Sequence, residues 1–129
     1  MDGTVISDAV NLASRVESLT KIYGVSLLIT ESTYAKLNDQ SQYHVRVIDV
    51  VKVKGKSKPV TIYEVYDADP ATEIILKDQT RQDFEKGFAC YHQGRLDIAK
   101  SFFRQVLQVN TQDKPAWIYL ERCEQKQVG

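Results

Sequence analysis

The stretch SDAVNLASRVESLTKIYG, residues 7–24, has the pattern of a capped amphipathic helix. Ser7 is a good N-cap, and Asp8 would lie near the positive end of the helix dipole, so we expect the helix to begin after Ser7. Apolar residues at i, i+4, i+7 and i+11 predict a buried stripe, formed by Leu12, Val16, Leu19 and Tyr23. Gly24 is then suited to end the helix in the left-handed conformation.

Asn11 and Arg15 lie beside this stripe, four residues apart, so one helical turn brings both side chains to the same side of the helix. Polar residues at this spacing usually form a solvated face, and the spacing alone favours that interpretation. A functional pair is the alternative. The sequence around the helix has to decide between the two.

Helix and strand patterns alternate up to about residue 67 and predict an α+β unit. After the first helix we expect a short buried strand, a two-turn helix capped by Thr30 and an antiparallel β-hairpin with a GKSKP turn, over residues 25–30, 31–38, and 44–54 paired with 60–66. The longer strand should place four valines on one face, namely Val45, Val47, Val51 and Val53. GTVI at residues 3–6 is compatible with a further strand.

Only helical patterns follow. We expect a linker over residues 68–78 and a helical tail over 79–129, with helices over roughly 79–92 and 96–109 and a third helix from about Pro115. The spacing of small and large residues resembles one tetratricopeptide repeat, carried by Gly87, Tyr91, Gly94, Leu96, Ala99, Phe103 and Leu107. The first helix of a second repeat would then hold Trp117, Tyr119 and Leu120. Because one repeat cannot bury its own faces, the tail either packs on the first unit or offers a peptide-binding groove.

The charges of the chain cancel, with 17 basic and 17 acidic residues, so no broad field attracts nucleic acid or an anionic membrane. A short basic ribbon lacks the stacking aromatic residues of a nucleic-acid site, and comprises Lys52, Lys54, Lys56 and Lys58. No apolar run approaches the roughly 20 residues of a membrane span, and no secretion signal begins the chain, so we expect a cytoplasmic protein. The two cysteines and two histidines have no metal-ligand spacing and are interpreted as packing or surface residues, namely Cys90, Cys123, His44 and His92.

Three blocks of the first unit resemble class III nucleotidyl cyclases, and occur in the order expected for that family. They are DGTVISDAVNLASRVESLTKIYG, ITESTY and VKVKGKSKPVTIYEV. The blocks are most similar to bacterial adenylate cyclases and extend over residues 1–66, about half of the chain. The resemblance implies the C-terminal part of a guanylate cyclase domain that forms cyclic AMP and pyrophosphate from ATP in intracellular signalling. The helical tail also resembles an extension that some bacterial members carry.

The same resemblance implies roles for four residues. Asn11 and Arg15 correspond to the Asn-x-x-x-Arg element of the family, in which Asn orients the ribose and Arg stabilises charge that develops on the α-phosphate. Thr4 corresponds to the residue that reads the purine edge. Lys54 corresponds to the lysine that binds the triphosphate, although an ordinary charged hairpin tip is also compatible with its position. Ser7 departs from the family, which usually has glycine there.

The two metal-binding aspartates of the family lie on a strand and a hairpin upstream of every block found here. They hold Mg²⁺ or Mn²⁺ in the intact enzyme, so we expect no metal site in this chain and no activity from it alone. None of the present candidates stands in a matching context, namely Asp2, Asp8, Asp39, Asp49 and Asp67. Family active sites form between two cyclase domains, so the implied partners are ATP and either a second cyclase domain or a second copy of this chain.

The sequence therefore predicts an α+β chain in two parts. Residues 1–67 would be the C-terminal part of a cyclase catalytic domain that keeps the transition-state half of the site, and 79–129 would form an all-α helical hairpin. The alternative is a non-catalytic interaction module, in which the tail binds a protein partner and the first unit is a scaffold.

Overall fold

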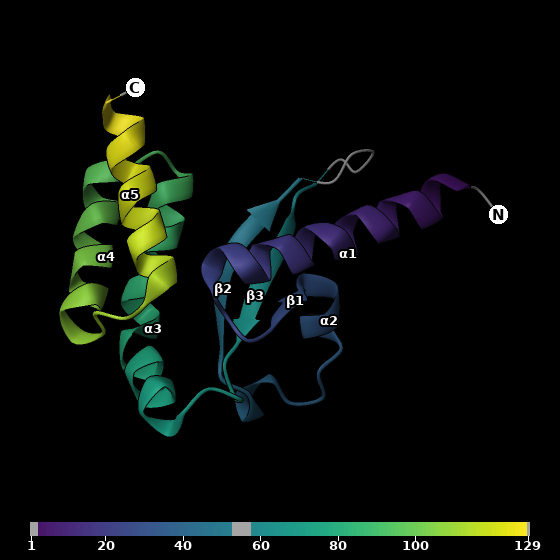
Figure 1. Cartoon of the computed structure of the whole chain (residues 1–129), viewed down its shortest axis with the longest axis horizontal. Helices are drawn as coiled ribbons and strands as arrows, with labels where there is room; N and C mark the ends of the chain where they lie inside the picture. The colour runs from purple at the N-terminus through teal and green to yellow at the C-terminus, as the bar shows by residue number, and fades with distance from the viewer. Residues whose placement is uncertain (1–2, 53–57, 129) are drawn as a thin grey trace. The chain divides into compact units, whose positions relative to one another are not determined.

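The computed structural model describes residues 3–52 and 58–128, and of these the side chains of residues 9–52 and 58–127. The chain divides into two compact units, residues 1–67 and 68–129 (Figure 1). The first unit is mixed α and β, and the second consists of helices, which confirms the predicted α+β fold class. No helix within the described ranges is both long and apolar enough to cross a membrane.

Helix α1 (Gly3–Tyr23) begins earlier than the sequence predicts. A start after Ser7 is wrong, because Ser7 lies inside α1, and so is a strand at GTVI, because these residues are helical too. A helix forms its hydrogen bonds within its own segment, whereas a strand needs a partner, and no strand in the described ranges pairs with this segment. The predicted end is confirmed: Gly24 has a φ of 64°, and the Val25 N–H donates to the Thr20 carbonyl over 3.2 Å.

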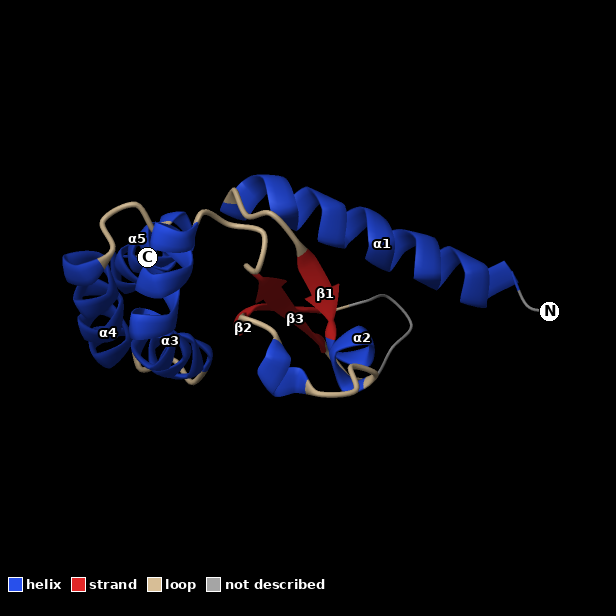
Figure 2. Cartoon of the chain, turned by 90° about the horizontal axis from the view of Figure 1, so that it is seen from below, coloured by secondary structure: helices blue, strands red, loops and turns tan. Residues whose placement is uncertain are grey.

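The sheet of the first unit has three antiparallel strands in the order β1-β3-β2. The strands are β1 (Leu28–Thr30), β2 (Val45–Val51) and β3 (Val60–Val65), each shorter than its predicted range. Helix α1 lies on one side of the sheet, and the short helix α2 (Glu31–Ala35) lies on the other (Figure 2). The predicted N-cap of α2 is confirmed, because the Thr30 hydroxyl accepts a hydrogen bond from the Thr33 N–H at 3.4 Å.

A β-bulge in β2 overturns the prediction that its valines share one face. Val47 is opposite Tyr63, but Asp49 is opposite Ile62, so Ile48 is an extra residue on β2. An inserted residue reverses the alternation of side chains beyond it. Val45 and Val47 therefore lie on the opposite face from Val51, while Val53 is outside the described residues.

An ion pair lies buried between the two long strands. Arg46 and Glu64 are opposite each other in the register, and the Arg46 Nε donates to the Glu64 Oε1 over 2.7 Å. Both side chains are completely buried. Glu64 is also opposite Leu28 on β1, so this level of the sheet joins all three strands.

The second unit contains α3 (Ala71–His92), α4 (Leu96–Val109) and α5 (Lys114–Val128). The predicted linker over 68–78 is wrong in its larger part, because α3 already begins at Ala71. An ion pair lies near this start: the Lys77 Nζ is 2.6 Å from the Asp69 Oδ2, and both side chains are largely buried. Gly94, with a φ of 78°, lies in the turn that separates α3 from α4.

Gly87 on α3 lies against the ring of Phe103 on α4. A Cβ at Gly87 would be 3.0 Å from the Phe103 Cζ and 3.1 Å from each Cε. The ring of Phe103 is fully buried, stacked on Tyr119 at 5.3 Å between centroids and edge-to-face with Phe84 at 5.5 Å. Because aromatic neighbours hold this ring, the glycine sets how closely the two helices approach.

Gly87→Ala should destabilise the second unit. Alanine improves the intrinsic helix propensity by about 1 kcal/mol, but the new methyl group overpacks a fixed aromatic ring, which costs about 1–3 kcal/mol. We expect a net fall in the free energy of unfolding of about 1 kcal/mol. Urea denaturation followed by circular dichroism measures this change.

The matched control is the double variant Gly87→Ala with Phe103→Leu. If the ring causes the cost, the smaller leucine makes room, and the two substitutions together cost less than the sum of the single variants. A Gly87→Ala protein that is more stable than the wild type would show that the helices separate freely.

Candidate functional site

Asn11 and Arg15 are both exposed and lie one turn apart on α1. The apolar stripe beside them is buried only toward the C-terminal end of the helix. Leu19 and Tyr23 are 9% and 0% exposed, whereas Leu12 and Val16 are partly exposed. The pair therefore lies on the part of α1 whose side chains remain accessible in this chain.

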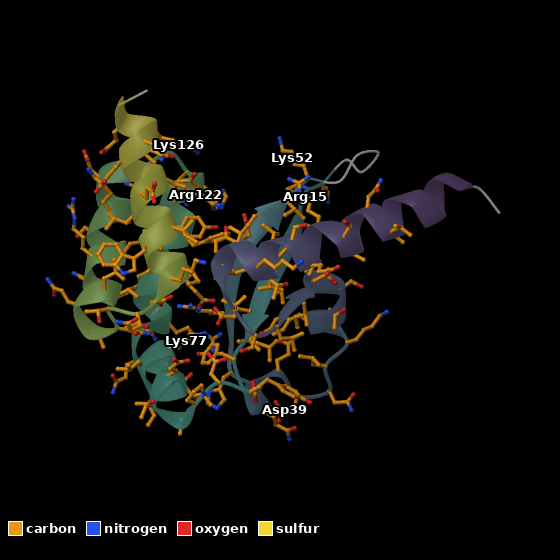
Figure 3. All side chains as sticks on the ribbon, in the orientation of Figure 1. Arg15, Asp39, Lys52, Lys77, Arg122 and Lys126 are labelled. Carbon is orange, nitrogen blue, oxygen red and sulfur yellow. The ribbon has the colours of Figure 1, made fainter. Side chains whose placement is uncertain are left out.

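Arg15 contacts the end of strand β2. Its Nη1 donates a hydrogen bond to the backbone carbonyl of Lys52 over 3.2 Å, across 37 positions of sequence. Figure 3 shows Arg15 and Lys52 at the same end of the first unit. The acceptor is neutral, so the bond orients the guanidinium and leaves its charge and most of its five N–H donors available.

A second contact fixes α1 against β2. The Tyr23 hydroxyl donates to the Asp49 Oδ2 over 2.6 Å, and Tyr23 is completely buried. Tyr23 lies about two helical turns beyond Arg15, and Asp49 lies three residues before Lys52. Two hydrogen bonds therefore join the same helix to the same strand and position the Arg15 side chain.

The two hydrogen bonds described above do not involve the other two predicted site residues, Thr4 and Lys54. Thr4 belongs to α1, but its side chain is outside the described part of the chain, and Lys54 lies wholly outside it. Lys52 precedes Lys54 by two residues. The structure thus joins the Asn11 and Arg15 helix to the strand that leads toward Lys54, and the roles of Thr4 and Lys54 stay predictions.

Sequence reasoning missed the position of Lys52. The sequence contains a signal, because lysine occurs at every second position from 52 to 58. The first of these lysines directly follows β2. Which helix meets that segment depends on the sheet register and the bulge, and neither is visible in the sequence.

The described residues do not fit a metal site. Among the side chains of residues 9–52 and 58–127, no three His, Cys, Asp or Glu residues converge as ligands of an ion would. Asp49 instead accepts the hydrogen bond of Tyr23.

The cysteines and histidines have packing roles in the described structure. Cys90 and Cys123 are unpaired thiols, and burial raises the pKa of the Cys123 thiol above its usual value. The ring of His44 lies 5.6 Å from that of Tyr66, and the ring of His92 lies 4.4 Å from that of Phe88. These contacts support the interpretation of both histidines as packing or surface residues.

The first unit is similar to a known protein family. Residues 4–66 match the family described as the adenylate and guanylate cyclase catalytic domain. This range holds α1, the sheet, Asn11 and Arg15. The match and the relatives below support a class III nucleotidyl cyclase for this segment.

Individual relatives are adenylate cyclases. The adenylate cyclase of Anabaena cylindrica is 54% identical over 66 residues, which are 50% of this chain and 13% of that protein. A terminal-differentiation-specific adenylate cyclase of Dictyostelium discoideum is 37% identical over 126 residues, 97% of this chain and 6% of that protein. Adenylate cyclase 1 of Rhizobium meliloti (strain 1021) is 39% identical over 62 residues, 48% of this chain and 9% of that protein.

These relatives are much longer than this chain, which spans 6–13% of their lengths. The similarity to the Dictyostelium protein continues through the helical unit, whereas the Anabaena match covers half of this chain. No solved structure matches the chain.

Proposed function

We propose that residues 4–66 are the part of an adenylate cyclase catalytic domain that stabilises the transition state. The reaction would be attack of the ribose 3′-oxygen of ATP on the α-phosphate, with formation of cyclic AMP and release of pyrophosphate. Asn11 would orient the ribose, and Arg15 would stabilise negative charge on the α-phosphate. Thr4 would read the adenine edge, and Lys54 would bind the triphosphate.

One observation carries this proposal. Arg15 is exposed, and a neutral carbonyl rather than a carboxylate holds its guanidinium in place. A guanidinium that is oriented before the substrate arrives requires little reorganisation when charge develops in the transition state. Its planar fork of donors also matches the geometry of phosphate oxygens.

The 129-residue polypeptide by itself should form no cyclic AMP. The resemblance places the metal-binding aspartates of the family upstream of the matched segment, and two-metal chemistry loses most of its rate without those ligands. The measurement is cyclic AMP formation from ATP with magnesium or manganese, using purified protein. Turnover that persists through purification and is abolished by Arg15→Ala would contradict this expectation.

A segment exchange tests the catalytic roles directly. Residues 1–66 of this chain replace the corresponding segment of the Anabaena cylindrica adenylate cyclase, which is 54% identical over 66 residues. The chimera should be active, and Asn11→Ala or Arg15→Ala should each lower its turnover by about 10²–10³.

Lys21→Ala is the matched control, because Lys21 is an exposed cation on the same helix. It should leave turnover unchanged, and none of the three substitutions should lower the thermal midpoint, since all three side chains are exposed. If Asn11→Ala and Arg15→Ala lower the stability strongly but the turnover only slightly, the proposed catalytic roles are wrong, and the two residues are part of a solvated polar face.

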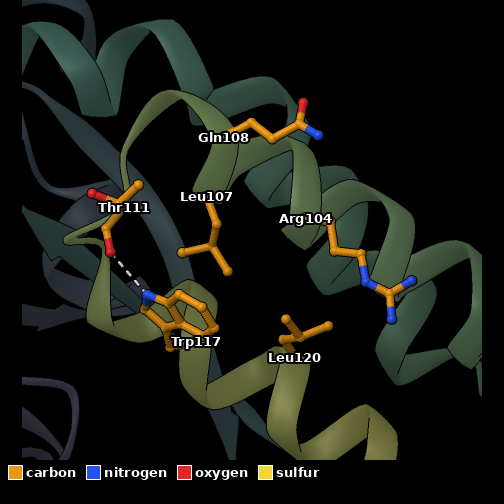
Figure 4. A pocket seen from close by; sticks show the side chains of 6 residues that line it. All are labelled: Arg104, Leu107, Gln108, Thr111, Trp117 and Leu120. Atoms are coloured by element: carbon orange, nitrogen blue, oxygen red, sulfur yellow. Dashed lines mark hydrogen bonds between the residues drawn. The ribbon is translucent and has the colours of Figure 1, made fainter.

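A second candidate function, a protein-interaction module, is favoured by a groove in the second unit. It has a volume of about 450 Å³ and lies between α4 and α5 (Figure 4), lined by Arg104, Leu107, Gln108, Thr111, Trp117 and Leu120. Trp117 is 52% exposed, yet its indole N–H donates to the Thr111 carbonyl over 2.8 Å. Tyr119, by contrast, is fully buried. A fixed, exposed tryptophan is typical of an interaction surface.

Self-association through this groove should appear as a molecular mass that rises with protein concentration in light scattering. Trp117→Ala should lower the association, because it removes the largest exposed apolar side chain of the groove. Ile98→Ala is the control, since Ile98 is a 43% exposed apolar residue of α4 that does not line the groove. A wild-type protein that stays monomeric at high concentration would overturn self-association.

A further inference from the structure

Two exposed cationic residues lie next to each other at the end of β2, where the Arg15 guanidinium contacts the backbone of Lys52. The Arg15 guanidinium lies 3.2 Å from the carbonyl oxygen of Lys52, so the two cationic residues are neighbours in space. Both side chains are exposed (Figure 3). Among the side chains of residues 9–52 and 58–127, no carboxylate lies at salt-bridge distance from either of them.

Arg46, the other arginine of the first unit, differs from Arg15 in burial and in having an acidic partner. Arg46 is buried and is neutralised by Glu64 over 2.7 Å. The other exposed lysines in the described part of this unit, namely Lys21, Lys36 and Lys58, make no hydrogen bond with an arginine. Within the described part of the unit, Arg15 and Lys52 are therefore an arginine and a lysine in direct contact, with both side chains exposed.

We propose that Lys52 completes, together with Arg15, a binding site for a polyphosphate. An anion with two or more adjacent phosphates would satisfy both cations at once, because Arg15 supplies a fork of donors and Lys52 a compact charge. Lys52 is distinct from Lys54, the residue that corresponds to the triphosphate-binding lysine of the cyclase family.

The inference rests on the proposed function for the identity of the natural ligand. There, Arg15 acts on the α-phosphate of ATP, and Lys52 would hold the β- and γ-phosphates that leave as pyrophosphate. Lys52 would bind these outer phosphates in the ground state and in the transition state alike. Its loss would therefore raise the KM more than it lowers the kcat.

The first experiment measures binding and needs no catalysis. Inorganic tripolyphosphate is titrated into the 129-residue protein at low ionic strength, and binding is followed by calorimetry and by amide chemical shifts. Lys52→Ala and Arg15→Ala should each weaken binding by about tenfold, whereas Lys52→Arg should retain it. Lys36→Ala is the control and should leave the affinity unchanged.

Equal weakening by Lys52→Ala and Lys36→Ala would overturn the inference, because tripolyphosphate would then respond to net charge alone. Absence of measurable tripolyphosphate binding to the wild-type protein would overturn it as well. Circular dichroism checks that each variant is folded, and the retained binding of Lys52→Arg separates the loss of a charge from a change in the strand.

The second experiment separates this inference from the proposed function. In the active Anabaena chimera, Lys52→Ala should raise the KM for ATP and weaken inhibition by pyrophosphate, each by about tenfold, with a smaller change in kcat. If the chimera is inactive but tripolyphosphate still binds through Lys52, the cyclase assignment fails and the site stands. If the chimera is active and Lys52→Ala changes neither constant, the site fails and the assignment stands.

Discussion

The buried ion pair between Arg46 and Glu64 fixes how the strands of the first unit pair. Removing one partner would leave an uncompensated charge in the interior, which typically costs about 3–5 kcal/mol. A shift of β2 along β3 by one residue would also separate the two charges and turn every following side chain to the other face. The register of the sheet is therefore held by electrostatics as well as by apolar packing.

The position of the candidate site follows from that register. Beyond Arg46, the bulge at Ile48 places Asp49 where it accepts the hydrogen bond of Tyr23, and β2 then ends beside Arg15. Helix α1 and strand β2 thus determine together where the guanidinium lies. The structure supports Asn11 and Arg15 as a candidate catalytic element because the end of β2 is held next to them.

The sequence predicts the features that depend on local chemistry. Gly24 ends α1 because glycine tolerates a positive φ, and Thr30 caps α2 because its hydroxyl accepts a backbone hydrogen bond. Asn11 and Arg15 are candidates because the blocks around them resemble those of nucleotidyl cyclases, and their roles stay predictions. Features that depend on contacts between distant segments are not predictable in this way. The bulge at Ile48, the pairing of Arg46 with Glu64, and the ion pair between Lys77 and Asp69 near the start of α3 all belong to this second group.

The chain contains one tryptophan, and Trp117 is held in a defined environment by its bond to the Thr111 carbonyl. Its fluorescence therefore comes from the groove between α4 and α5. The first unit contains tyrosine but no tryptophan, so light that excites tryptophan and not tyrosine selects the groove. One native residue thus supplies a built-in optical probe of this groove.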